Sequence, residues 1–133
     1  MIVLDASAVI ELLLGTAAGA SVAKRIVRRG ESIHAPHLID VEVAHVLRRL
    51  QAAGDLGDER GREALADLAD LDLDRHSHHD LLPRVWELRH KVTAYDAVYL
   101  ALAEVLGAPL LTLDQKLASS SGHDAQIELV RSP

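Results

Sequence analysis

The chain contains no cysteine and no phenylalanine, and its tyrosines and tryptophan are limited to Trp86, Tyr95 and Tyr99. The absence of cysteine excludes a disulfide framework, a thiolate metal site and a cysteine nucleophile, and it fits a reducing compartment. Because aromatic residues are scarce, leucine, valine, isoleucine and alanine must build the core. The same scarcity leaves little for a platform on which nucleic acid bases could stack.

The sequence also lacks a hydrophobic run of the roughly 18 residues that a membrane-spanning helix needs. The apolar N-terminal segment has no basic start and is interrupted by Asp5, so a signal peptide is not expected. Hydrophobic residues make up 49% of the chain and charged residues 26%, which excludes a disordered tail and a collagen-like repeat. For 133 residues we expect one domain, residues 1–133, in the cytoplasm.

The formal net charge of −6 comes from one acidic stretch. Residues 55–74 hold eight acids and two bases, Arg60 and Arg62, whereas the rest of the chain carries 12 residues of each sign. Basic residues gather at 24–29, 48–49 and 84–91. Each basic cluster can be a solvated helix face, but a local basic rim that attracts nucleic acid stays open as the alternative.

Short apolar runs alternate with helical patterns along the chain. We predict strands over residues 2–5, 32–35, 71–74, 110–113 and 127–130, and helices over residues 8–14, 18–29, 38–53, 58–71, 79–91 and 94–106. Within the helix predicted at 79–91, Leu82, Val85, Trp86 and Leu88 are expected to face the core. The alternation is typical of an α/β domain with a mainly parallel sheet.

Two acids close apolar strands, Asp5 after the first and Asp114 after the fourth. Ligands bind at the carboxyl ends of parallel strands, and both carboxylates project at that edge of the sheet. Either residue alone is better explained as the N-cap of the helix that follows it.

Two further acids, Glu42 and Asp96, share helix faces with apolar residues. A carboxylate on an inward face is costly unless it is paired or bound to metal. Glu42 could instead pair with Arg49 or His45, and Asp96 could be an ordinary first-turn acid that the helix dipole favours.

Taken together, the four carboxylates point to a hard divalent cation. Without matching bases they would repel one another and their pKa values would rise, and Mg²⁺ or Mn²⁺ removes that penalty. Such an ion lowers the pKa of a bound water and orients it for attack on a phosphodiester. Ser7 and Thr112 each lie two residues from one of these acids, so they could hold the acids or metal-bound waters, or serve only as turn and strand residues.

Four segments carry a family resemblance: residues 1–8 (MIVLDASA), the Glu42 helix after Ala35-Pro36, residues 95–103 (YDAVYLALA) and residues 111–114 (LTLD). In order and spacing, over nearly the whole chain, they resemble a PIN domain of the VapC type, the toxin of a bacterial type II toxin–antitoxin pair. The resemblance implies a three-layer α/β sandwich with a mainly parallel five-stranded sheet flanked by helices. It also implies an endoribonuclease that depends on Mg²⁺ or Mn²⁺.

The resemblance assigns roles to the residues that match the family's pattern. It implies that the catalytic, metal-binding acids are Asp5, Glu42, Asp96 and Asp114, the first three more securely, and that Ser7 and Thr112 support them. It further implies an RNA substrate, a VapB-type antitoxin that covers the acidic pocket, a homodimer, and no membrane. A helical arm within residues 38–71 would grip the antitoxin, and Asp40 is expected to be an N-cap or a solvated residue.

Other classes remain as alternatives. The first is a catalytically inactive PIN-like interaction module. A phosphatase with an aspartate nucleophile would need a second acid at position 7, where Ser7 stands, and a receiver domain would need paired acids near the first strand. His76, His78 and His79 are expected to be surface residues, while His37 and His45 lie nearer the Glu42 segment and could touch RNA.

Overall fold

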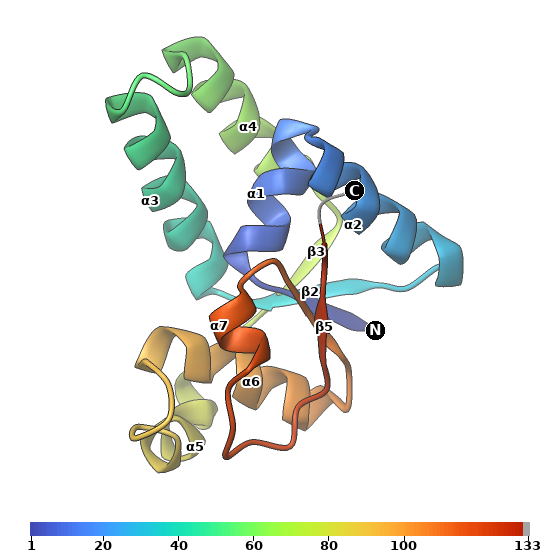
Figure 1. Ribbon diagram of the computed structural model, residues 1–133, viewed down its shortest axis with the longest axis vertical. Helices are drawn as coiled ribbons and strands as arrows, with labels where there is room; N and C mark the ends of the chain where they lie inside the picture. The colour runs from blue at the N-terminus through green and yellow to red at the C-terminus, as the bar shows by residue number, and fades with distance from the viewer. Residues whose placement is uncertain (132–133) are drawn as a thin grey trace.

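The computed structural model describes residues 1–131 and contains a parallel sheet at its centre (Figure 1). Its five strands lie in the order β3-β2-β1-β4-β5, with the bounds β1 (Ile2–Leu4), β2 (Ile33–Pro36), β3 (Leu73–His76), β4 (Leu110–Thr112) and β5 (Ile127–Leu129). All four strand pairs are parallel. The predicted α/β class with a parallel five-stranded sheet is therefore confirmed.

Helices cover both sides of this sheet. They are α1 (Ala6–Leu14), α2 (Ala17–Arg29), α3 (Leu38–Ala52), α4 (Asp58–Asp70), the 3-10 turn η1 (His79–Leu81), α5 (Leu82–Glu87), α6 (Ala94–Leu106) and α7 (Gln115–Ala118). In Figure 1, α1 to α4 lie in the upper part of the molecule and α5 and α6 in the lower part, with α7 beside β5. No single helix of residues 1–131 is both long and apolar enough to cross a membrane, although α1 and α2, bent by 106°, reach that length and composition as a pair.

The central strand β1 explains how the sheet places a site at its edge. Ile2, Val3 and Leu4 are fully buried, because helices cover both faces and β2 and β4 pair on either side. Leu4 lies beside Leu111 in the register of β1 and β4. The residues that follow these partners, Asp5 and Thr112, therefore lie at the same edge of the sheet.

Helix α6 forms the buried floor next to this edge. Seven consecutive residues, 97–103, are buried, as a helix that is apolar all round predicts. The Thr93 side chain caps its first turn and Gly107 ends it at a φ of 60°. The predicted bounds of 94–106 are confirmed.

The prediction of one continuous helix over residues 79–91 is wrong. The chain forms a 3-10 turn and then the six-residue α5, which ends at Glu87. Val85 and Leu88 are buried as expected, but Leu82 is 48% exposed and Trp86 67% exposed. Since the helix has fewer than two turns, only a narrow stripe can reach the core.

The third strand is displaced from its predicted bounds of 71–74 to residues 73–76. Pairing with β2 sets this register, which runs from Ile33 beside Leu73 to Pro36 beside His76. The shift places Nε2 of His76 2.8 Å from Nδ1 of the buried His34. His76 and the half-buried His78 are thus not the surface residues that we expected, whereas His79 is exposed.

Candidate active site

Asp5 is the most buried of the candidate acids, with 7% of its surface exposed. It is the N-cap of α1, and its Oδ1 accepts hydrogen bonds from the Ala8 amide (3.1 Å) and the Ser7 hydroxyl (2.6 Å). Its Oδ2 accepts one from the Thr112 hydroxyl. Burial raises the pKa of Asp5, and these hydrogen bonds oppose that effect. Capping and a place in an acidic site are therefore compatible.

Ser7 and Thr112 fix the position of this carboxylate. The Ser7 hydroxyl also accepts a hydrogen bond from the Leu113 amide (2.9 Å), and that of Thr112 accepts one from the Asp114 amide (3.0 Å). Their two oxygens are 3.3 Å apart. Each hydroxyl thus links Asp5 to the end of β4, which is one of the arrangements that their spacing predicts.

Glu42 projects from α3 and is half-buried. Within residues 1–131 it forms no ion pair with Arg49 or His45, and its Oε1, like the Tyr99 hydroxyl, is buried without a hydrogen bond. Burial raises the pKa of Glu42, the nearby Tyr99 hydroxyl opposes the rise, and the charges of Asp96 and Asp5 add to it. A partly buried carboxylate with a raised pKa fits a position that a cation can occupy.

Asp96 lies in the first turn of α6, where the Thr93 hydroxyl accepts a hydrogen bond from its amide (3.2 Å). Asp96 is therefore a first-turn acid, as one of its two explanations predicted. Burial and the charges of Asp114 and Asp5 nevertheless raise the pKa of the Asp96 side chain, while Lys116 opposes this rise. The carboxylate thus lies within range of the charges of Asp114 and Asp5.

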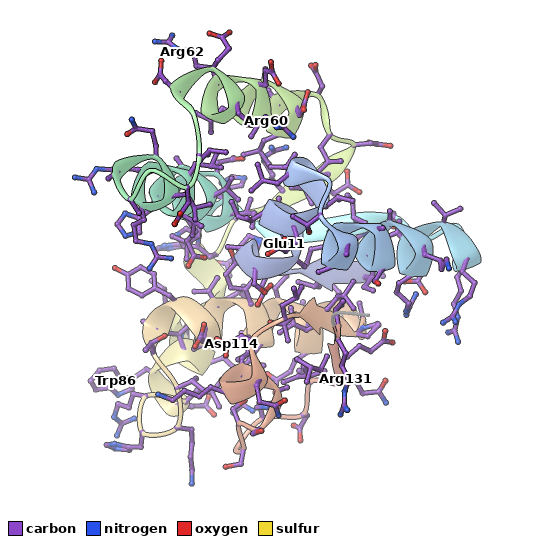
Figure 2. All side chains as sticks on the ribbon, turned by 45° about the horizontal axis from the view of Figure 1, so that its top comes forward. Glu11, Arg60, Arg62, Trp86, Asp114 and Arg131 are labelled. Carbon is purple, nitrogen blue, oxygen red and sulfur yellow. The ribbon has the colours of Figure 1, made fainter. Side chains whose placement is uncertain are left out.

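Asp114 is the N-cap of α7, and its Oδ1 accepts hydrogen bonds from the amides of Lys116 (2.9 Å) and Leu117 (3.3 Å). It is exposed, and Figure 2 shows it among the lower group of helices. Its charge reaches both Asp5 and Asp96, because it raises the pKa of each.

The four acids form what we call the acidic cluster: Asp5, Glu42, Asp96 and Asp114. Asp5, Glu42 and Asp96 each have a pKa that is raised in part by the charge of another member of the cluster. Within residues 1–131, however, no three acidic or histidine side chains already stand in a metal-binding group. Carboxylate oxygens are the ligands that Mg²⁺ prefers, and Mg²⁺ also keeps several waters in its protein sites.

Asp40 lies outside the acidic cluster and is not an N-cap, whereas its side chain is 44% exposed, which agrees with the expected solvated residue. The N-cap of α3 is His37. The Asp40 carboxylate instead accepts hydrogen bonds from Nε (2.8 Å) and Nη2 (2.9 Å) of Arg75 on β3. Only the fold brings these residues together, so spacing in the sequence held no signal for the pair.

Two cavities reach the acidic cluster from different sides. One of about 480 Å³ is lined by Asp96 and by several cations, among them Lys116. The other, of about 510 Å³, lies along α3 and is lined by Glu42, Val41 and Tyr95 among others. The basic stretch at 84–91 could be recognised in the sequence. That Lys116 lines the same cavity could not.

Replacing Asp96 by asparagine is expected to stabilise the metal-free protein at neutral pH. The raised pKa of Asp96 means that the folded chain binds more protons than the unfolded chain between the ordinary and the raised pKa, so stability falls as the pH rises through that window. Removing the charge should add on the order of 1 kcal/mol, or about 4 °C in Tm.

Thermal unfolding in EDTA between pH 4 and pH 8 measures this effect. The gain should shrink as the pH falls, because the wild-type Asp96 then becomes protonated. Asp67→Asn, at an exposed position of α4, is the matched control and should leave Tm unchanged. A lower Tm for Asp96→Asn at neutral pH would show that repulsion does not dominate at this residue.

Comparisons with known proteins agree with this geometry. The PIN domain family matches residues 2–121. The chain is 45% identical over 130 residues to Ribonuclease VapC12 of Mycobacterium tuberculosis, covering 98% of this chain and 99% of that protein. It is 44% identical to Ribonuclease VapC1 of the same organism, covering 97% of each chain.

Solved structures share the fold at lower identity. A protein of Pyrobaculum aerophilum, PAE2754, superposes with a TM-score of 0.68 at 22% identity, covering 95% of this chain and 87% of the other. VapC20 of Mycobacterium tuberculosis, described as a sarcin-ricin loop cleaving toxin, gives 0.61 at 21% identity, covering 90% and 94%. The sequence relatives, the matched domain and the sheet topology lead to one assignment: the chain belongs to the PIN-domain family and, within it, to the VapC-type ribonucleases.

Proposed function

We propose that this chain is the toxin of a type II toxin–antitoxin pair and an endoribonuclease that hydrolyses RNA phosphodiester bonds at the acidic cluster with Mg²⁺ or Mn²⁺. One observation carries the proposal. Asp5, Glu42 and Asp96 come from three separate elements, have raised pKa values, and form no ion pair with a cation of residues 1–131. A cluster of this kind costs stability in the absence of a bound cation.

The residues of the cluster divide the work. Asp5 is held rigidly by Ser7, Thr112 and the start of α1, so it would provide the fixed point of the ion site. Glu42 offers its free Oε1 from α3, and Asp96 and Asp114 complete the cluster from the other side of the sheet edge. A divalent ion bound there would lower the pKa of a water ligand and neutralise charge on the phosphate oxygens.

The names of the relatives support the choice of RNA, since VapC12 and VapC1 are called ribonucleases and VapC20 a toxin that cleaves the sarcin-ricin loop. The cavity beside Glu42 supports the antitoxin. There Val41 is 69% and Tyr95 62% exposed, an apolar surface that an apolar segment of a VapB-type antitoxin could cover. The homodimer stays a prediction that follows from family membership.

Metal dependence tests the proposal directly. The purified chain should cleave end-labelled RNA with Mg²⁺ or Mn²⁺, and EDTA should reduce cleavage at least about a hundredfold, because the acids alone cannot offset the charge of the phosphate. Restoring the metal should restore activity.

Two results would contradict it. Full cleavage in EDTA would reject the metal site. Absence of cleavage together with absence of Mg²⁺ or Mn²⁺ binding in calorimetry would favour the inactive PIN-like interaction module.

A further inference from the structure

The cavity beside Asp96 has an unusual concentration of positive charge. It lies between α7 and the segment that links α5 to α6, and we call it the basic pocket: Arg89, His90, Lys91, Thr93, Asp96 and Lys116 line it. Asp96 is the one acid among the described residues that line it. Because Asp96 lines this pocket and also belongs to the acidic cluster, the basic pocket continues directly into that cluster.

The cations of the basic pocket are not used to hold the fold together. Arg25, Arg75 and Arg84 each form an ion pair with a carboxylate at 2.7 to 2.9 Å. By contrast, no ion pair within residues 1–131 engages Arg89, Lys91 or Lys116, and all three are exposed. Their charge is therefore available to a ligand.

Lys91 is held in place by a close backbone approach. A Cβ built on Gly122 would lie 2.9 Å from Cγ of Lys91, and the φ of Gly122 is +88°. The positive φ favours glycine there, and the stem of Lys91, which lines the pocket, packs against the backbone of this loop.

An exposed aromatic surface stands at the outer end of the basic pocket. The guanidinium carbon of Arg89 lies 4.4 Å from the ring centroid of Trp86, and Arg89 also donates a hydrogen bond to the Trp86 carbonyl (2.8 Å). Trp86 remains 67% exposed, and Figure 2 shows it at the edge of the molecule beside the lower helices. An indole stacked with a guanidinium and open to solvent is a surface on which a nucleic acid base can stack.

We propose that the basic pocket binds the single-stranded RNA that adjoins the cleaved bond, with phosphates on Lys116 and Lys91 and a base stacked against the Trp86–Arg89 pair. The proposal rests on the proposed function, because it takes the acidic cluster as the place of cleavage. Cations alone would also suit an acidic peptide. The neighbouring aromatic stack and the continuity with a phosphodiester site favour RNA.

Binding in EDTA tests the pocket separately from cleavage. The probe is a labelled single-stranded RNA of about 12 nucleotides followed by anisotropy. Trp86 is the sole tryptophan, so its fluorescence should change when RNA binds to the wild type. Lys116→Ala and Lys91→Ala should each raise Kd several-fold and reduce the slope of log K against log salt by about 0.7 for each lost phosphate contact. Trp86→Ala should raise Kd at least about fivefold.

Arg28→Ala combined with Arg29→Ala, at exposed positions of α2, is the matched control and should leave Kd unchanged. Circular dichroism verifies that each variant is folded. Poly-glutamate serves as a second probe that stands for an acidic peptide. The proposal is overturned if the folded pocket variants bind RNA as the wild type does, including the case in which they lose only the binding of poly-glutamate. RNA binding that depends on the pocket in a chain that never cleaves RNA would support the pocket while rejecting the nuclease function.

Discussion

Asp5→Asn is expected to reduce RNA cleavage at least about a thousandfold while the fold remains intact. Asparagine keeps the shape of aspartate, and its oxygen can still accept from the Ala8 amide and the Ser7 hydroxyl. It loses the charge that the proposed ion site would need to hold a divalent ion. The hydrogen bonds that hold Asp5 would keep an asparagine in the same position, so residue 5 would continue to fill that place and no neighbouring acid could take it over.

Single-turnover cleavage of labelled RNA measures this loss, and Asp67→Asn on α4 should cleave as the wild type does. In cells, expression without the antitoxin should arrest growth with the wild type and not with Asp5→Asn. An Asp5→Asn protein that cleaves RNA with metal at the wild-type rate, or that arrests growth equally well, would reject the assignment of the acidic cluster as the active site.

Gly19→Ala should cost about 3 kcal/mol of stability and about 10 °C in Tm. A Cβ at Gly19 would lie 2.0 Å from the carbonyl oxygen of Glu11, so α2 crosses α1 at a distance that only glycine allows. The same carbonyl accepts a hydrogen bond from the Thr16 amide at the corner between the helices. The backbones of α1 and α2 cannot move apart without breaking the hydrogen bond between Thr16 and Glu11.

Gly61→Ala is the matched control, since it is the same substitution inside helix α4. Its Cβ would meet only Cδ2 of Leu56, at 3.7 Å, which is an ordinary contact. Alanine's higher helix propensity should therefore raise stability by about 1 kcal/mol. Thermal unfolding of the two variants should shift in opposite directions, and a Gly19→Ala protein as stable as the wild type would disprove the close crossing.

The parts of the fold that could be predicted are those in which the local pattern and the tertiary environment agree. The strand after Met1 is apolar throughout because both its faces are buried, and helix α6 is apolar throughout for the same reason. The predicted ends of these strands lie only one residue beyond the observed ones, so Asp5 and Asp114 could be placed at one edge of the sheet from the sequence.

The parts that could not be predicted depend on partners distant in the chain. Strand β3 takes its register from β2, Asp40 takes its role from Arg75, and His76 lies inward because His34 is there. Trp86 looked like a core residue because of its type, whereas the brevity of α5 leaves it outside. Competing explanations of Asp5 and Asp96 proved compatible, since one carboxylate residue can both begin a helix and face other acids.

The strand order has a consequence for synthesis of the protein. Strand β4, which pairs with β1, comes almost last in the chain, and Asp114 follows it. A growing polypeptide therefore lacks one wall of the acidic cluster until residues beyond 114 have left the ribosome. Products of premature termination before β4 would carry three of the four carboxylates yet no assembled edge to hold them, so only nearly full-length molecules would be harmful to the cell that makes them.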